Sequence, residues 1–316
     1  MTLRRAALTA LPLLALGGCA AFQADDVGTE EDDGGGGAVT VFASFYPLEY
    51  LAGQIGGDRV EVSSLTPPGA DPHSVELAPR TVADLGEADL AVVLSGFQPA
   101  VDEALSVTGV PVFDAGEHTE LLTTEETGHD HSHDDDHEHG HAEGTLDPHF
   151  WLDPERLADV ATALADELTE RDPDGADTYR ANADRLLTDL EDLDEELAAG
   201  LASCQGDTIV VAHEAYGYLT SEHGLQQEGL SGIDPEAEPS PARLAEIADV
   251  VAEHDVDTIF VETLLSPAVS EALAEDLGLQ TAVLDPLENQ QDESADYLDV
   301  MRANLGALQE ALGCAA

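Results

Sequence analysis

Short apolar runs alternate with helical patterns from residue 39 to the end of the chain, and this alternation most limits the possible folds. Strands that alternate with helices form parallel sheets that helices cover. The expected strands are 39–45, 60–65, 90–94 and 110–113 in the first half, and 208–212, 225–230, 258–261 and 281–284 in the second. The pattern predicts an α/β protein with one sheet in each half.

A long helix is predicted between the two halves, at residues 176–202. Its leucines recur three and four residues apart, at Leu186, Leu187, Leu190, Leu193 and Leu197. Such a segment would span roughly 40 Å, so it can act as a stiff connector. The alternative is a surface helix that packs on the second half alone. We expect two lobes, each a mostly parallel sheet flanked by helices, joined by one long rigid α-helix, with boundaries at 39–172, 173–203 and 204–316.

Three helix starts are marked by a possible N-cap residue followed by proline at the first helical position. They are Asp153-Pro154, Ser240-Pro241 and Ser266-Pro267.

The first 18 residues have the features of an export signal. Arg4 and Arg5 precede an apolar stretch, 6–16, that is too short for the roughly 20 residues of a membrane-spanning helix. The following Leu16-Gly17-Gly18-Cys19 resembles a lipobox, which would make Cys19 the lipidated first residue of the mature chain. The alternative is an ordinary cleaved signal with an incidental cysteine. Residues 19–38, acidic and rich in glycine, would then tether an extracytoplasmic protein to the outer face of the cell membrane.

Export would place Cys204 and Cys314 where disulfides can form. A bond between them would join the start of the second lobe to the end of the chain. The alternative is two buried free thiols.

The charge of the chain is extreme. Ten arginines oppose 67 acidic residues, which gives a formal charge of −57. Nucleic acid is a poor partner for such a surface, and the membrane is expected to be contacted only through the lipid anchor. Because charge repulsion is strongly screened when the Debye length falls to about 3 Å near 1 M salt, we expect the protein to function in high salt.

A histidine-rich run lies inside the predicted loop 117–146 and has metal-binding composition. It lacks apolar residues that could anchor it in a core, so it is expected to be exposed. An engineered tag is disfavoured by the internal position, and a merely solvated polar loop is the other alternative. Its histidines are His129, His131, His133, His137, His139 and His141.

Four further candidate ligands each follow a predicted strand or loop: His73, His149, His213 and Asp285. In open α/β sheets, ligands bind outside the carboxyl ends of the strands, so these side chains can meet in a cleft between the lobes. Three imidazoles and one carboxylate, or a water in its place, suit tetrahedral Zn²⁺. Taken singly, each histidine could be structural, and Asp285 could be a turn or cap residue.

These residues sit in motifs that resemble one known family. The motifs are Gly-Ala-Asp-Pro-His (69–73), Asp-Pro-His-Phe-Trp-Leu-Asp-Pro (147–154), His-Glu-Ala-Tyr-Gly-Tyr (213–218), Phe-Val-Glu (260–262) and Leu-Asp-Pro-Leu (284–287). They resemble the metal-binding proteins that feed ABC transporters, the cluster A-I or cluster 9 solute-binding family.

The resemblance implies one metal ion between the lobes, with His73, His149, His213 and Asp285 as ligands. Manganese and iron carriers of that family have Glu at the third ligand position, so His213 and the histidine-rich insertion resemble the zinc branch. The implied function is high-affinity capture of Zn²⁺ and its delivery to an ABC permease with its ATPase. The implied protein is a monomer and not an enzyme.

Several alternatives stay open. Glu262, after the predicted strand 258–261, could orient an imidazole or form a structural salt bridge. Mn²⁺ or Fe²⁺ could be the cargo instead. An exported zinc hydrolase would need Glu262 as its general base, and a surface adhesin with a metal-buffering loop would bind several ions weakly.

Overall fold

Four parallel strands form the first sheet, in the order β2-β1-β3-β4. The computed structural model describes residues 38–128, 145–292 and 294–315. The strands are β1 (Val39–Ala43), β2 (Val60–Ser64), β3 (Leu90–Val93) and β4 (Val112–Asp114). The accompanying helices are α1 (Tyr46–Gly56), α2 (Pro79–Leu85), α3 (Pro99–Thr108) and α4 (Pro154–Arg171). Short 3₁₀ turns lie at Gly57–Arg59, Ala115–Glu117, Phe150–Leu152 and Pro173–Gly175.

The second sheet repeats this order, as β6-β5-β7-β8, and is again parallel. Its strands are β5 (Thr208–His213), β6 (Gln226–Ser231), β7 (Thr258–Val261) and β8 (Gln280–Val283). Its helices are α6 (Gly217–Glu222), α7 (Pro241–Glu253), α8 (Ala268–Leu277) and α9 (Tyr297–Ala311). The predicted fold class is confirmed: two parallel sheets are flanked by helices.

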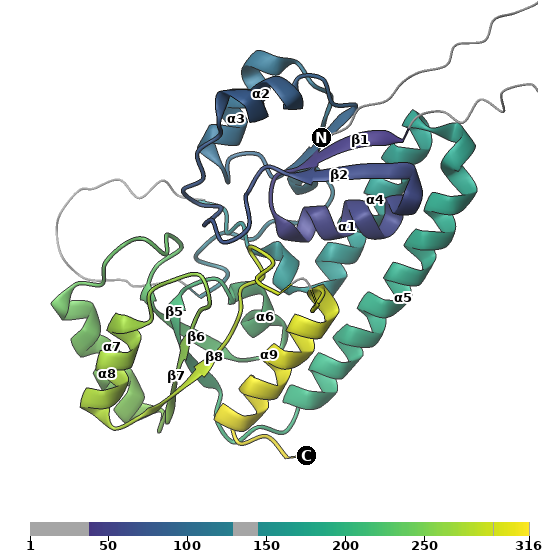
Figure 1. Ribbon diagram of the computed structural model, residues 1–316. Coiled ribbons are helices and arrows are strands. Elements are labelled where there is room, and N and C mark those ends of the chain that lie inside the picture. Colours follow the sequence, from purple (N-terminus) through teal and green to yellow (C-terminus); the bar gives the residue numbers. More distant parts are fainter. Residues whose placement is uncertain (1–37, 129–144, 293, 316) are drawn as a thin grey trace, which may run out of the picture. The chain divides into compact units, whose positions relative to one another are not determined.

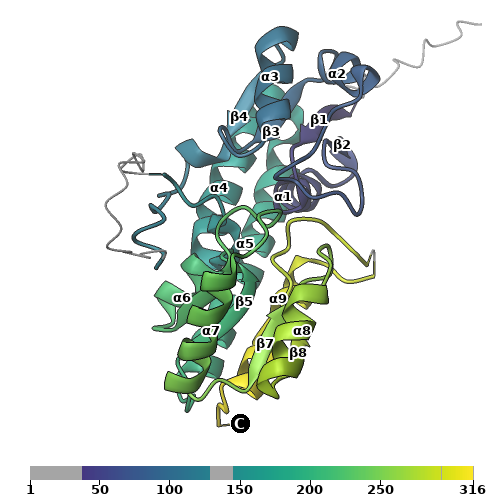
Figure 2. The same cartoon turned by 90° about the vertical axis from the view of Figure 1, so that its left-hand side faces the viewer.

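The long helix is α5, which runs over Ala176–Leu201. Its leucine face is buried, including Leu186, Leu190, Leu193 and Leu197. In Figures 1 and 2, α5 runs alongside both halves, and it contacts α1 and α4 of the first half and α9 of the second. One apolar core includes residues of both halves and of α5, and residues 38–316 form one compact unit. The helix therefore packs on both halves rather than on the second alone.

Two of the three predicted helix caps are present. The Asp153 side chain accepts hydrogen bonds from the first-turn amides of α4, and Ser240 accepts one from the Arg243 amide in α7. The prediction for Ser266 is wrong, because α8 begins at Ala268 with Pro267 in the cap position and without a side-chain cap bond.

A disulfide bond joins Cys204 and Cys314, which are 110 residues apart. Cys204 follows α5, and Cys314 follows α9. The bond therefore links the start of the second half to the end of the chain.

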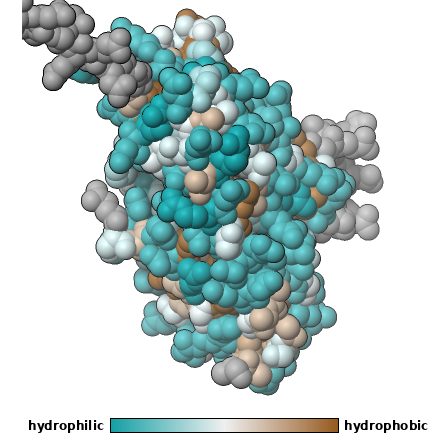
Figure 3. Space-filling view, turned by 90° about the vertical axis from the view of Figure 1, so that its right-hand side faces the viewer, coloured by the Kyte–Doolittle hydropathy of each residue, from teal (hydrophilic) through white to brown (hydrophobic). Residues whose placement is uncertain are grey.

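One face of the molecule is largely polar. Figure 3 views the molecule from the right-hand side of Figure 1, and that face is mostly hydrophilic with small, scattered apolar areas. No helix in the described ranges is both long and apolar enough to cross a membrane. The predicted signal, Cys19, the tether and the histidines from His129 to His141 lie outside the described residues.

Candidate metal centre

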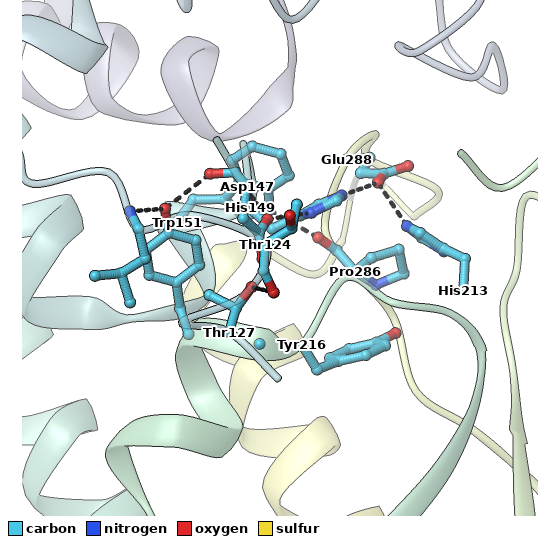
Figure 4. Close-up of polar contacts among 12 residues, drawn as sticks. Thr124, Thr127, Asp147, His149, Trp151, His213, Tyr216, Pro286 and Glu288 are labelled. Carbon is cyan, nitrogen blue, oxygen red and sulfur yellow. Dashed lines mark hydrogen bonds and ion pairs between the residues drawn. The ribbon is translucent and has the colours of Figure 1, made fainter. Parts of the chain in front are cut away.

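Three histidines and one glutamate, drawn from both halves of the chain, come together in one cluster. They are His73, His149, His213 and Glu288, and their nearest donor atoms all lie within 4.8 Å of one another. The Nε2 atoms of the three imidazoles lie 3.0, 3.2 and 3.3 Å from the same oxygen, Oε1 of Glu288. Figure 4 shows His149 and His213 pointing toward Glu288.

His73 lies in the loop that follows β2. The Asp71 carboxylate accepts the backbone N–H of His73 at 2.8 Å, which fixes a tight turn around Pro72. The Gln98 side chain, which follows β3, donates to the carbonyl of Pro72 at 3.2 Å. His73 is the one partly exposed member of the cluster.

His149 is fully buried and is held by a turn of the same design. Asp147 accepts both the backbone N–H of His149, at 2.9 Å, and its ring Nδ1–H, at 2.8 Å. The Tyr218 hydroxyl donates to the Asp147 carbonyl at 2.7 Å. Because Nδ1 is occupied by Asp147, Nε2 of His149 is directed toward Glu288.

His213 is the last residue of β5, and Glu262 directly follows β7. These strands are neighbours with Val210 opposite Ile259, so three residues further along His213 lies opposite Glu262. Glu262 accepts the ring Nδ1–H of His213 at 2.7 Å and its backbone N–H at 3.2 Å. In the strand order β6-β5-β7-β8, β6 lies on one side of β5 and the next strand of the chain, β7, lies on the other. The strand order therefore reverses at β5 and β7, and open α/β sheets bind ligands at such switch points.

The carboxylate in the cluster is Glu288 and not Asp285, which the sequence predicted as the fourth ligand. Asp285 comes directly after the strand region, but both its oxygens are used nearby: Oδ1 accepts the Leu287 N–H at 2.8 Å and Oδ2 accepts the Thr263 hydroxyl at 3.0 Å. Leu287 has a φ of 60°, in the left-handed region, which reverses the chain. Glu288 consequently enters the site in its place.

The charges of these groups are strongly coupled. Burial lowers the pKa of His213, but the nearby charge and hydrogen bond of Glu262 outweigh burial, so the pKa is raised well above its ordinary value. For His149, burial is likewise outweighed by Asp147 and Glu288, and the pKa is raised. Burial alone would raise the pKa of Glu288, but its close contacts with the three imidazoles hold it well below its usual range.

The arrangement fits a tetrahedral metal ion. With ligand bonds of about 2.0 Å, tetrahedral geometry places neighbouring ligand atoms about 3.3 Å apart, close to the three nitrogen–oxygen separations found here. Nε2 of His213 is buried and has no hydrogen-bond partner among the described residues, because its 3.3 Å approach to Glu288 lacks hydrogen-bond geometry. A cation between the imidazoles and the carboxylate would satisfy that nitrogen.

Sequence reasoning found three of the four clustered side chains and missed Glu288 and Asp147. Asp147 did have a signal, because the Asp-Pro-His step occurs at both 71–73 and 147–149, and an aspartate two residues before a histidine can bind its backbone. No comparable signal marks Glu288, since the reversal at Leu287 occurs at a residue other than glycine.

Two α/β halves packed on one long helix, with a buried three-histidine and one-carboxylate cluster between the sheets, define a metal-binding protein of the solute-binding type. The model for the zinc-uptake complex component A, periplasmic (ZnuA), matches residues 41–311. The chain belongs to this ZnuA family, whose members are components of transport systems.

Two curated relatives illustrate the match. The high-affinity zinc uptake system protein ZnuA of Bacillus subtilis is 32% identical over 89% of this chain and 89% of its own length. The zinc-binding lipoprotein AdcA of Streptococcus pneumoniae is 32% identical over 87% of this chain, which spans only 56% of AdcA.

Solved structures agree with the family. The Zn(II)-bound ZnuA-like domain of Streptococcus pneumoniae AdcA matches with a TM-score of 0.72 and 30% identity, over 87% of this chain and 99% of that one. The laminin-binding protein Lmb of Streptococcus agalactiae, described as having adhesin and metal transporting activity, matches with a TM-score of 0.76 and 32% identity, over 87% of this chain and all of that one.

Proposed function

We propose that this protein captures a single Zn²⁺ ion outside the cytoplasm and hands it to an ABC-type permease with its ATPase. The observation that carries the proposal is the convergence of three imidazole Nε2 atoms on one oxygen of Glu288. The zinc ion would be the transported substrate and not a permanent cofactor. The cluster offers it three nitrogen ligands and one oxygen ligand, with nitrogen–oxygen distances that suit tetrahedral geometry. Membership of the ZnuA family supports zinc as the ion and transport as the purpose.

The ligands we propose are His73, His149, His213 and Glu288. Three neutral imidazoles favour zinc over manganese, because carboxylate, carbonyl and water ligands suit Mn²⁺ better. With these four ligands, side chains would fill all four coordination positions and would leave none open for the activated water of a hydrolase.

Zinc binding is tested by calorimetry on the purified chain stripped of metal. Wild-type protein should bind one ion tightly, and deletion of residues 129–141 should leave this tight site in place. The double variant His73→Ala/His149→Ala should lose it, whereas His118→Ala, just after the 3₁₀ turn at Ala115–Glu117 and outside the cluster, should not. Tight binding that survives in the double variant would remove the proposal.

A lipid anchor at Cys19 is a second part of the proposal, supported by the lipobox-like Leu16-Gly17-Gly18-Cys19. Expressed in its own host, the protein should fractionate with membranes, and Cys19→Ala should release it. Mass spectrometry of the mature N-terminus should show a lipid on Cys19. A mature chain without lipid would refute the anchor at Cys19 but not the extracytoplasmic location.

We further propose that the run His129 to His141 is an accessory that collects zinc. Its histidines and acids coordinate and attract cations, but the sequence contains nothing that would fix their geometry. We expect its sites to be weaker than the central site. The calorimetric titration should therefore show additional weak binding that disappears in the deletion variant.

A further inference from the structure

Asp285 occupies an unusual position for a partly buried carboxylate next to the proposed metal site. It is three residues from Glu288, yet neither of its oxygens belongs to the cluster. Oδ1 accepts the N–H of Leu287 at 2.8 Å, and Oδ2 accepts the hydroxyl of Thr263 at 3.0 Å. The first bond closes a turn over Pro286, and the second ties that turn to the end of β7.

The backbone of the same residue is clamped by α9. The Asn304 side chain donates to the carbonyl of Asp285 at 2.7 Å and accepts its N–H at 2.9 Å. Asn304 is 3% exposed, so water does not compete freely for these two bonds. Asp285 is thus fixed at its N–H, its carbonyl and both carboxylate oxygens.

The flanking residues are held from the other half of the molecule. Nε1 of Trp151 donates to the Pro286 carbonyl at 2.8 Å, as Figure 4 shows, and the Asn289 side chain donates to the carbonyls of Pro67 and Ala70 at 2.8 Å each. Between these anchors lies Leu287, with its φ of 60°. A residue other than glycine in that conformation costs about 1 kcal/mol or more and persists only where its surroundings enforce it.

We infer that Asp285 is a positioning residue: its bond to the Leu287 amide holds the left-handed turn that carries the Glu288 carboxylate into the metal site. The inference builds on the proposed zinc site and assigns a role to a residue outside it. Without the bond, the turn can relax to ordinary φ values, and Glu288 loses its fixed distance to the three imidazoles. Zinc would then keep its three histidines and exchange a protein carboxylate for water.

Asparagine at position 285 separates this role from direct coordination. Its side-chain oxygen can accept the Leu287 N–H and its amide can donate to the Thr263 hydroxyl, but it carries no negative charge. Asp285→Asn should therefore keep the turn, whereas Asp285→Ala removes it. If Asp285 coordinated the metal itself, both substitutions would weaken binding.

The experiment measures zinc affinity by competition with a chromophoric chelator for wild type, Asp285→Asn, Asp285→Ala and Glu288→Gln, with Asp276→Ala on exposed α8 as matched control. Loss of a residue that supports a ligand costs about 10- to 100-fold in affinity, and this is the loss expected for Asp285→Ala, while Asp285→Asn should stay within about threefold of wild type. Substitution of Co²⁺ for Zn²⁺ gives the geometric readout: the visible bands of the Asp285→Ala protein should shift toward those of Glu288→Gln, and those of Asp285→Asn should match wild type.

An affinity of Asp285→Asn as low as that of Glu288→Gln would overturn the inference, and so would wild-type affinity and bands in Asp285→Ala. If Asp285→Ala does not fold, the comparison of Asp285→Asn with Glu288→Gln still decides, because both side chains are nearly isosteric with the originals. A wild-type protein that binds no zinc would refute the proposed function instead, so the two failures are distinguishable.

Discussion

Glu262 accepts a hydrogen bond from Nδ1 of His213 at 2.7 Å, and this bond leaves Nε2 as the nitrogen that faces the other cluster members. A carboxylate on the far side of a ligating imidazole fixes its tautomer and raises its basicity. Glu262→Ala should therefore lower zinc affinity by about 10- to 100-fold, and Glu262→Gln, which can still accept the bond, should lower it less. A competition titration measures both.

The matched control for that experiment is Glu271→Ala, which removes an exposed carboxylate of α8 in the same half. It should leave zinc affinity unchanged. If Glu262→Ala binds zinc as tightly as Glu271→Ala, Glu262 has only a structural role.

The raised pKa values of His149 and His213 predict a pH-dependent response to zinc. In the metal-free protein, a histidine whose pKa is higher in the folded state than in the unfolded state stabilises the fold when it is protonated. This stabilisation is complete below about pH 6.5, the pKa of an unfolded histidine, and is lost as the pH rises through the raised value. Zinc needs the deprotonated imidazoles, so its stabilisation grows over the same interval. The increase in melting temperature on adding zinc should be larger at about pH 8 than at about pH 6.

His118 supplies the control for the pH experiment, because it lies outside the cluster and stacks on Phe113. His118→Ala should show the same growth of the zinc effect with pH. An equal zinc effect at both pH values in wild type would mean that the two buried imidazoles are already neutral without metal.

Trp151 is the chain's single tryptophan, and it reports on the site. It is fully buried, its ring centre lies 5.2 Å from that of His149, and it bonds to the Pro286 carbonyl. Zinc should change its fluorescence and reach saturation at one equivalent, even without residues 129–141. A fluorescence change that needs several equivalents of zinc would contradict a single central site. So would a change of equal size in the His73→Ala/His149→Ala variant.

The charge of −57 predicts strong stabilisation by salt. Carboxylate repulsion is screened as the Debye length falls from about 10 Å at 0.1 M to about 3 Å at 1 M. The melting temperature should rise by at least about 5 °C over that range, corresponding to roughly 2 kcal/mol for a chain of this size. Sucrose, which stabilises proteins without screening charge, is the control. A melting temperature independent of salt would remove the argument for a high-salt habitat.

The sheets and α5 were predictable because their signals are local. Strands buried on both faces are nearly continuous apolar runs, as at 208–212, and the leucine spacing in 176–202 is specific for a helix. Strand ends then located the three histidines, because parallel strands present their carboxyl ends at one edge. The same reasoning from strand ends predicted Asp285 as the fourth ligand. The backbone turns at Leu287, and Glu288 lies in the cluster instead.

The residues that support the cluster differ in how well the sequence alone could predict their contacts. Asp71 and Asp147 stand two residues before their histidines, so a local turn could have revealed both bonds. Glu262 meets His213 only because β5 and β7 are neighbours, although 49 residues separate the two. Asn304 has no local signal at all, since its amide binds a residue 19 positions earlier in another element. Such partners depend on the assembled fold.

The bond between Cys204 and Cys314 turns the second half of the chain into a covalent ring, so α9 has no loose end from which to fray. Helix termini ordinarily open first, and here opening would have to begin inside the ring. The helix carries Asn304, which clamps Asp285, and Tyr297, whose hydroxyl donates to the Trp151 carbonyl at 2.6 Å. Reduction of the bond beyond the end of α9 is therefore expected to loosen the helix that supports Glu288 through Asn304 and Asp285.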